Sequence, residues 1–130
     1  MNIAVRYYSR SGNTKALAEA LAKGAGVEAV SVDQFNAGFK APVDVLFIGG
    51  ALYAYGIDKK LSNYLGKLKK EKVKKAVVFS TSWVSKHSID LIKKALKEKG
   101  IEVVEEAFYV RNKPNEAKLK EAEEFAKKFI

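Results

Sequence analysis

The sequence contains no cysteine, one histidine and only two prolines among its 130 residues. Without a thiol there is no disulfide framework, no thiolate metal site and no cysteine nucleophile. A lone histidine, without carboxylates at ligand spacing, also argues against a dedicated metal centre. No run of about 18 apolar residues is present, so we expect no membrane span. The chain begins directly with a strand pattern rather than a cleavable leader, and we expect a cytoplasmic protein.

Acidic residues are also scarce relative to basic ones. The chain has 24 Lys and Arg against 15 Asp and Glu, a net charge of +9. Such an excess is typical of proteins that bind nucleic acid or an acidic partner. The lysines follow predicted helix surfaces rather than alternating with aromatic side chains, which argues against nucleic acid as a partner. We interpret the densest run, Lys67–Lys75, as a solvated helix end and turn.

Short apolar segments alternate with segments of helical periodicity along the chain. The expected strands are 3–8, 27–32, 43–50, 75–80 and 101–110, and the expected helices are 13–23, 58–70, 88–99 and the segment from 114 onward. This alternation predicts a single α/β domain over residues 1–130, a doubly wound, five-stranded parallel sheet of order 2-1-3-4-5. Asp33–Pro42 is too polar and broken for a helix, so the second helix of such a fold is reduced or absent.

The loop after the first strand has the composition of an anion site. It contains, in order, Ser9, Arg10, Ser11, Gly12, Asn13 and Thr14, and an Ala- and Leu-rich helix follows. Unpaired amides and the helix dipole favour an anion at such a helix start, where small hydroxyl residues add donors. Ordinary helix capping explains the same residues, and both interpretations stay open. The loop lacks the P-loop and dinucleotide patterns, which disfavours ATP and NAD.

Two further loops are expected at the same edge of the sheet. The loop after the third strand contains Ala51, Leu52, Tyr53, Ala54 and Tyr55, and the loop after the fourth contains Ser80, Thr81, Ser82 and Trp83. Neutral phosphate donors beside flat aromatic side chains suit a ligand with a phosphate tail and a planar ring. The alternative is that the aromatic residues are packing residues under long loops.

These three loops resemble those of the flavodoxin family. Residues 8–14 match the phosphate-loop pattern of the family throughout, 48–54 resemble its first flavin loop, and 79–82 resemble the start of its second. Element order and length agree over essentially the whole chain. The resemblance implies an FMN cofactor held by these loops, with no catalytic or metal-binding residues. The implied cofactor contacts are Ser9, Arg10, Ser11, Gly12, Asn13, Thr14, Ala51, Leu52, Tyr53, Ala54, Tyr55, Ser80, Thr81, Ser82 and Trp83.

The resemblance implies an electron-transfer protein that carries one or two electrons between redox partners. Two alternatives stay open: an FMN-dependent flavoenzyme, such as a quinone reductase or a protoporphyrinogen-oxidase-like protein, and a flavin-free basic binding module. The absence of loop insertions that would build a substrate pocket favours the carrier. Flavodoxins are typically acidic, whereas this chain is basic, so we expect an acidic redox partner protein. We favour a monomer.

Two charged residues receive simple interpretations from the sequence. Arg6 falls inside the expected central strand, where an unpaired guanidinium is too costly to bury. We expect it to reach water or an anion through the face that the missing helix uncovers. Asp58 precedes a helix, and capping together with the helix dipole explains it.

Overall fold

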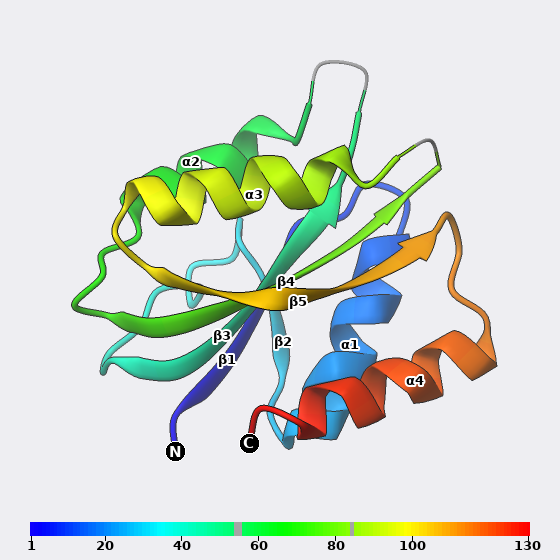
Figure 1. The fold of residues 1–130 in the computed structure, drawn as a ribbon, viewed down its shortest axis with the longest axis horizontal. Helices are drawn as coiled ribbons and strands as arrows, with labels where there is room; N and C mark the ends of the chain where they lie inside the picture. Colours follow the sequence, from blue (N-terminus) through cyan, green and yellow to red (C-terminus); the bar gives the residue numbers. More distant parts are fainter. Residues whose placement is uncertain (54–55, 84) are drawn as a thin grey trace.

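The computed structural model describes residues 1–53, 56–83 and 85–130. Its five parallel strands form one sheet of order β2-β1-β3-β4-β5, which confirms the predicted fold. In the described residues, α1, α2 and α3 each connect two strands, and α4 follows the last strand (Figure 1). In chain order the elements are β1 (Ile3–Tyr7), α1 (Asn13–Ala25), β2 (Ala29–Ser31), β3 (Val43–Ala51), α2 (Lys59–Lys67), β4 (Val73–Ser82), α3 (His87–Glu98), β5 (Glu102–Arg111) and α4 (Glu116–Lys127).

The sheet is covered on both faces, α1 and α4 lying on one face and α2 and α3 on the other (Figure 1). Successive residues of β3 point to opposite faces, so Phe47 packs with the α1 and α4 side and Ile48 with the α2 and α3 side. Both side chains are completely buried. Burial on two sides explains why this strand is an almost continuous apolar run.

The close approach of α1 and α4 depends on a glycine. A Cβ atom added to Gly24 would lie 2.2 Å from the carbonyl oxygen of Glu123, closer than any real contact. Gly24 therefore brings the two helix backbones together near the C-terminal end of α1. A side chain here would force α1 and α4 apart.

No helix connects β2 to β3, as predicted, and residues 32–42 form turns instead. The expectation for Arg6 is wrong, however, because these turns cover it. Arg6 is only 8% exposed, and its Nε donates to the carbonyl of Ala37 at 2.8 Å while Nη1 donates to that of Val5 at 3.1 Å. Its guanidinium also lies 5.0 Å from the centre of the Phe39 ring. Carbonyl oxygens and an aromatic face thus replace the water that burial removes.

The ends of some elements differ from the predicted ones. The α2 helix ends at Lys67 rather than at residue 70, because Leu68 is already extended and its amide closes the last turn on the carbonyl of Leu65 at 3.2 Å. The edge strand β2 is confined to Ala29–Ser31, where it pairs with β1. No helix in the described part of the chain has the length and apolar character needed to cross a bilayer.

Candidate functional site

The three predicted loops meet at one edge of the sheet. They lie at the ends of β1, β3 and β4, which are adjacent in the sheet, and the carboxyl ends of parallel strands lie at the same edge. The predicted loop residues Ala51 and Ser80–Ser82 are the last residues of β3 and β4 instead, because both strands continue further than predicted. A cavity of about 150 Å³ lies between the loops. Its described lining is Arg10, Ser11, Asn13, Ala51, Leu52, Tyr53, Thr81, Ser82, Trp83 and Asn112. All of these except Asn112 are among the predicted contacts.

The first loop is built around Gly12, which adopts the left-handed conformation with φ 95°. Its amide donates to Ser9 Oγ at 3.0 Å, and its carbonyl accepts the first bond of α1 from the amide of Ala16 at 3.0 Å. The helix amides that precede Ala16 have no intrahelical carbonyl partner, and the positive end of the helix dipole lies here. This arrangement suits an anionic group such as a phosphate.

The far side of the first loop is joined to a fourth loop, after β5, that the sequence analysis overlooked. Ser11 Oγ accepts from the amide of Asn13 at 3.4 Å, and Asn13 Nδ2 donates to Asn112 Oδ1 at 3.4 Å. Asn112 has φ 63°, the one positive φ among the described residues other than glycine. The rule that ligands bind at the carboxyl ends of strands applies equally to β5 and is the signal that would have identified Asn112.

Two of the predicted contacts point into the protein rather than into the cavity. Thr14 is 1% exposed, and its hydroxyl oxygen lies 2.6 Å from that of Thr81, which fastens the start of α1 to the end of β4. Ser80 is completely buried, and its hydroxyl donates to the carbonyl of Gly50 at 2.5 Å and lies 2.6 Å from Ser88 Oγ. Both residues fix the spacing of the loops.

Arg10, the only charged residue of the first loop, is directed sideways across the site. Its Nε and Nη2 atoms donate to Asp58 Oδ2 at 2.8 and 2.5 Å, and its guanidinium lies 3.9 Å from the centre of the Tyr53 ring. Asp58 also caps α2 by accepting from the amide of Lys60 at 2.8 Å. Asp58 therefore has two roles, capping α2 and pairing with Arg10, and the sequence interpretation included only the first.

The pKa values in this cluster follow from these contacts. Burial acts to raise the pKa of the Asp58 carboxyl, but the bond from the Lys60 amide and the pairing with Arg10 outweigh it and leave that pKa below its usual value. The pKa of Tyr53 is raised because burial outweighs the opposing effect of Arg10. Tyr53 and Gly56 exchange backbone bonds of 2.7 and 3.0 Å. The predicted contacts Ala54 and Tyr55 lie outside the described residues.

Ser82 has a polar atom with no partner. Its Oγ is buried, lies beside the cavity and forms no hydrogen bond in the described structure, whereas its carbonyl accepts from Tyr109 Oη at 2.8 Å and from the amide of Asn112 at 3.1 Å. Buried hydroxyls nearly always have a partner, because an unsatisfied one costs free energy. A polar ligand atom in the cavity would supply that partner.

Trp83 lies at the surface of the site with 63% of the residue exposed. Its carbonyl accepts from Arg111 Nε at 3.2 Å, and the Arg111 guanidinium lies 5.6 Å from the ring centre. The indole is therefore placed beside the cavity with much of its surface available to a planar ligand. Arg111 is the last residue of β5 and directly precedes the overlooked loop that contains Asn112.

A family model described as a flavodoxin domain matches residues 4–128. The chain belongs to the flavodoxin family. No protein of curated function matches the sequence. FMN is the cofactor that family membership implies, and in general flavodoxins transfer electrons to redox partner proteins.

Solved structures of similar fold include several flavodoxins. One, from the domain Archaea, is 20% identical with a TM-score of 0.78, and the alignment covers 99% of this chain and 96% of that one. Oxidised flavodoxin 1 from Bacillus cereus is 20% identical with a TM-score of 0.81, covering 99% and 97%. The flavodiiron core of Flv1 from Synechocystis is 26% identical with a TM-score of 0.79. The match covers 99% of this chain but only 35% of that longer protein.

The residues present fit FMN. The cavity lies at the switch point between β1 and β3, and flavodoxins are themselves a standard example of ligand binding there. The Gly12 turn at the start of α1 provides neutral donors suited to a phosphate, and the Ser82 hydroxyl needs a polar partner. Tyr53 and Trp83 supply aromatic surface for a planar ring system.

Proposed function

We propose that this protein is an electron carrier that takes one or two electrons from one redox partner and delivers them to another, acting as a single domain over residues 1–130. The observation that carries the proposal is the exposure of the site at the surface, where Trp83 lies beside the cavity with 63% of the residue exposed. A cofactor bound beside such an exposed side chain lies near the surface, where a partner protein can approach it.

In this proposal each group of residues has a distinct role toward FMN. The first-turn amides of α1, with Ser9 and Ser11, bind the phosphate, while Tyr53 and Trp83 orient the ring and exclude water from it. The Ser82 hydroxyl bonds a polar atom of the cofactor. Bound FMN supplies the one- and two-electron chemistry. The Arg10–Asp58 pair holds the Tyr53 loop against the phosphate loop.

The charge around the site supports an acidic partner. Arg111 lies beside the exposed Trp83, and Lys86 lies near the same edge, 5.5 Å from the centre of the Tyr109 ring. Charge complementarity mainly accelerates the encounter of two proteins, so a partner with a negatively charged surface would approach this edge fastest. Monomeric state and location in the cytoplasm stay predictions, which sedimentation and cell fractionation would check.

Two measurements on the purified protein test the proposal. An absorption spectrum, followed by release and identification of the flavin, should show FMN and not FAD. Under anaerobic conditions the reduced protein should then pass electrons to a one-electron acceptor protein faster than it reduces a quinone. Gly12→Asp protein is the control for catalysis by free flavin. A quinone-reduction rate that saturates with quinone and exceeds the rate of electron transfer to the acceptor protein would indicate a flavoenzyme. A colourless protein that does not take up FMN would leave only the flavin-free basic binding module.

A further inference from the structure

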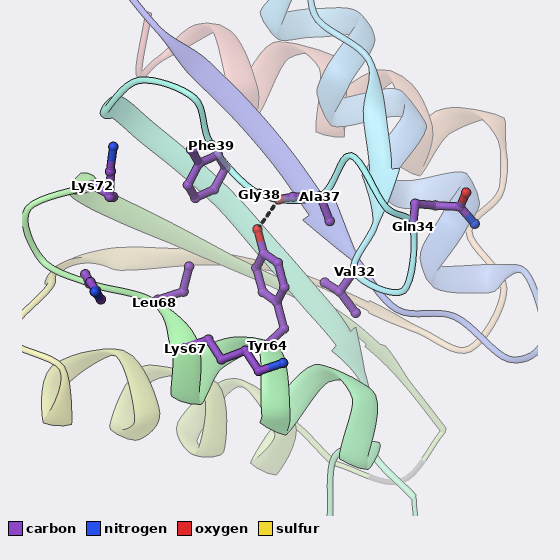
Figure 2. Close-up of a pocket in the computed structure, with 10 residues that line it drawn as sticks. Val32, Gln34, Ala37, Gly38, Phe39, Tyr64, Lys67, Leu68 and Lys72 are labelled. Atoms are coloured by element: carbon purple, nitrogen blue, oxygen red, sulfur yellow. Dashed lines mark hydrogen bonds between the residues drawn. The ribbon is translucent and has the colours of Figure 1, made fainter.

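A second and larger cavity lies away from the flavin loops, where the fold lacks its second helix. It has a volume of about 460 Å³, within the range of small-molecule sites, and shares no lining residue with the flavin cavity. One wall is the C-terminal part of α2 and the turn after it, and the other is the 32–42 segment (Figure 2). We refer to this cavity as the lysine groove.

Hydrogen bonds to one carbonyl hold the two walls of the lysine groove in place. The Ala37 carbonyl accepts from Tyr64 Oη of α2 at 2.5 Å, a bond drawn in Figure 2, and also from Arg6 Nε of β1 at 2.8 Å. Ala37 is 3% exposed, and the bond from Arg6 is buried while the bond from Tyr64 is partly buried. These bonds fix the separation of the two walls, so a ligand would enter a shape that already exists.

The inner surface of the lysine groove is apolar. Val32, Phe39 and Tyr64 line it and pack against the buried cluster between the sheet and α2 and α3. Leu68, which is 7% exposed, closes the end beyond α2. Figure 2 shows Phe39 and Tyr64 projecting from opposite walls. The hydrophobic effect favours an apolar occupant for such a surface.

The rim of the lysine groove is basic. Lys67, Lys69 and Lys72 line it, all three are exposed, and none of the described lining residues is acidic. No ion pair within the described structure involves any of the three. They belong to the Lys67–Lys75 run, whose sequence interpretation was a solvated turn. Solvation accounts for exposed lysines but not for their arrangement around an apolar hollow.

We propose that the lysine groove binds a small amphipathic anion, with an apolar body against Phe39, Tyr64 and Val32 and a carboxylate or similar group facing the lysines. The apolar lining selects the body, and the unpaired positive rim selects the sign of the end group. A nucleic acid would bind the lysines of the rim but would make no use of the apolar lining. The site is separate from the flavin site, so the proposal stands or falls independently of the carrier function.

Dodecanoate is a suitable probe, with dodecyltrimethylammonium as a ligand that has the same tail and the opposite charge. Titration calorimetry on the FMN-loaded protein, below the micelle concentration, should show saturable one-to-one binding of dodecanoate and weaker binding of the cation. Backbone NMR should show shifts at Val32, Gly38 and Tyr64, while the flavin absorption spectrum stays unchanged. Non-saturable binding, or NMR shifts located elsewhere, would overturn the proposal.

Two double variants distinguish binding of dodecanoate in the lysine groove from nonspecific attraction of an anion to a basic protein. Lys69→Gln with Lys72→Gln should weaken dodecanoate binding about three- to tenfold, the range expected when one or two exposed ion pairs are lost. Lys94→Gln with Lys97→Gln on α3 removes the same charge from another exposed surface and should leave the affinity unchanged. Val32→Asn tests the apolar lining and should also weaken binding. Equal losses in the two lysine pairs, or binding of an oligonucleotide in place of dodecanoate, would refute the site.

Discussion

Arg10 and Asp58 are joined across the proposed flavin site, with two guanidinium nitrogens of Arg10 lying 2.8 and 2.5 Å from the same oxygen of Asp58. The loop after β1 is thereby tied to the start of α2, 48 residues further along the chain. The same guanidinium lies over the Tyr53 ring. One side chain of the first loop therefore contacts both Tyr53 of the second loop and the start of α2.

Substitutions at Asp58 should separate its capping role from its charge. Asp58→Ala should lower the free energy of unfolding by about 1–2 kcal/mol, because the α2 cap and the Arg10 pair are both lost. Asp58→Asn keeps a capping oxygen and should cost less. Urea unfolding of both variants measures the difference. Equal stability of the alanine and wild-type proteins would contradict the capping role.

The lowered pKa of Asp58 also predicts how stability changes with pH. The folded-state pKa of Asp58 lies below the ordinary aspartate value of about 3.9, so the folded form binds its proton less readily than the unfolded form. This contribution to stability is present above the unfolded-state pKa and is lost as the pH falls through the folded-state pKa. Unfolding measured below about pH 4 should therefore show a smaller loss of stability in Asp58→Asn than in wild type. Parallel pH profiles would contradict this.

Gly12→Asp should abolish FMN binding, because it places a negative side chain at the proposed phosphate site. Gly12→Ala is the matched control. A Cβ here meets no atom within 4 Å, so alanine adds only the strain of the left-handed conformation, about 1–2 kcal/mol. FMN titration of the apoproteins should rank wild type above alanine and aspartate last. Full cofactor occupancy in Gly12→Asp would show that the phosphate binds elsewhere.

Ser82→Ala should have opposite effects on the apoprotein and on cofactor binding. Removing an unsatisfied buried hydroxyl should leave the apoprotein as stable as wild type or up to roughly 1 kcal/mol more stable. FMN affinity should fall by about 0.5–1.5 kcal/mol if the hydroxyl bonds the cofactor. Thermal unfolding of the apoprotein and flavin titration give the two values. A destabilised apoprotein with unchanged FMN affinity would show that the Ser82 hydroxyl has a structural role and does not bind the cofactor.

Tyr53 and Trp83 should together account for much of the contact with the flavin ring. Replacing both with alanine should weaken FMN binding by about 1–3 kcal/mol, and the remaining flavin should fluoresce more strongly because its aromatic neighbours are gone. The single variants show which side chain contributes more. Tyr109→Phe, which removes only the bond to the Ser82 carbonyl, is a control for indirect effects on the loop. An unchanged dissociation constant in the double variant would contradict contact.

The basic edge should affect both the potential of the flavin and the choice of partner. Because positive charge stabilises added electrons, we expect the second-electron potential of bound FMN to be less negative than in acidic flavodoxins. Arg10 contributes little to this, since Asp58 balances its charge, whereas Arg111 lies beside Trp83. Each exposed charge contributes about 1 kcal/mol or less. Potentiometric titration of Arg111→Gln should show a shift to more negative potential.

Electron transfer to an acidic partner should slow as salt is added, because the attraction that guides the encounter is screened. Stopped-flow measurements over a range of ionic strength, with Arg111→Gln and with Lys97→Gln on α3 as the control, test this. The Arg111 variant should be slower at low salt and similar to wild type at high salt. An electron-transfer rate to acidic partners that rises with salt would contradict the expected attraction.

The sequence by itself determined the order of the elements, the strand order of the sheet and the absence of the second helix. These features follow from local patterns: buried parallel strands are continuous apolar runs, helices have a period of 3.6 residues, and crossovers between parallel strands are right-handed. The position of the three loops at one edge follows from the same strand order. Family membership then identified the cofactor.

Only the tertiary structure decided which partner each polar group takes. Arg10 could have faced a phosphate but contacts Asp58, Thr14 bonds Thr81, and Arg6 lies beneath Ala37 instead of reaching solvent. The lysine groove likewise exists only because distant segments meet around it. A guanidinium or hydroxyl bonds whichever acceptor lies within about 3 Å, and packing between distant segments sets that distance. No local pattern in the sequence encodes it.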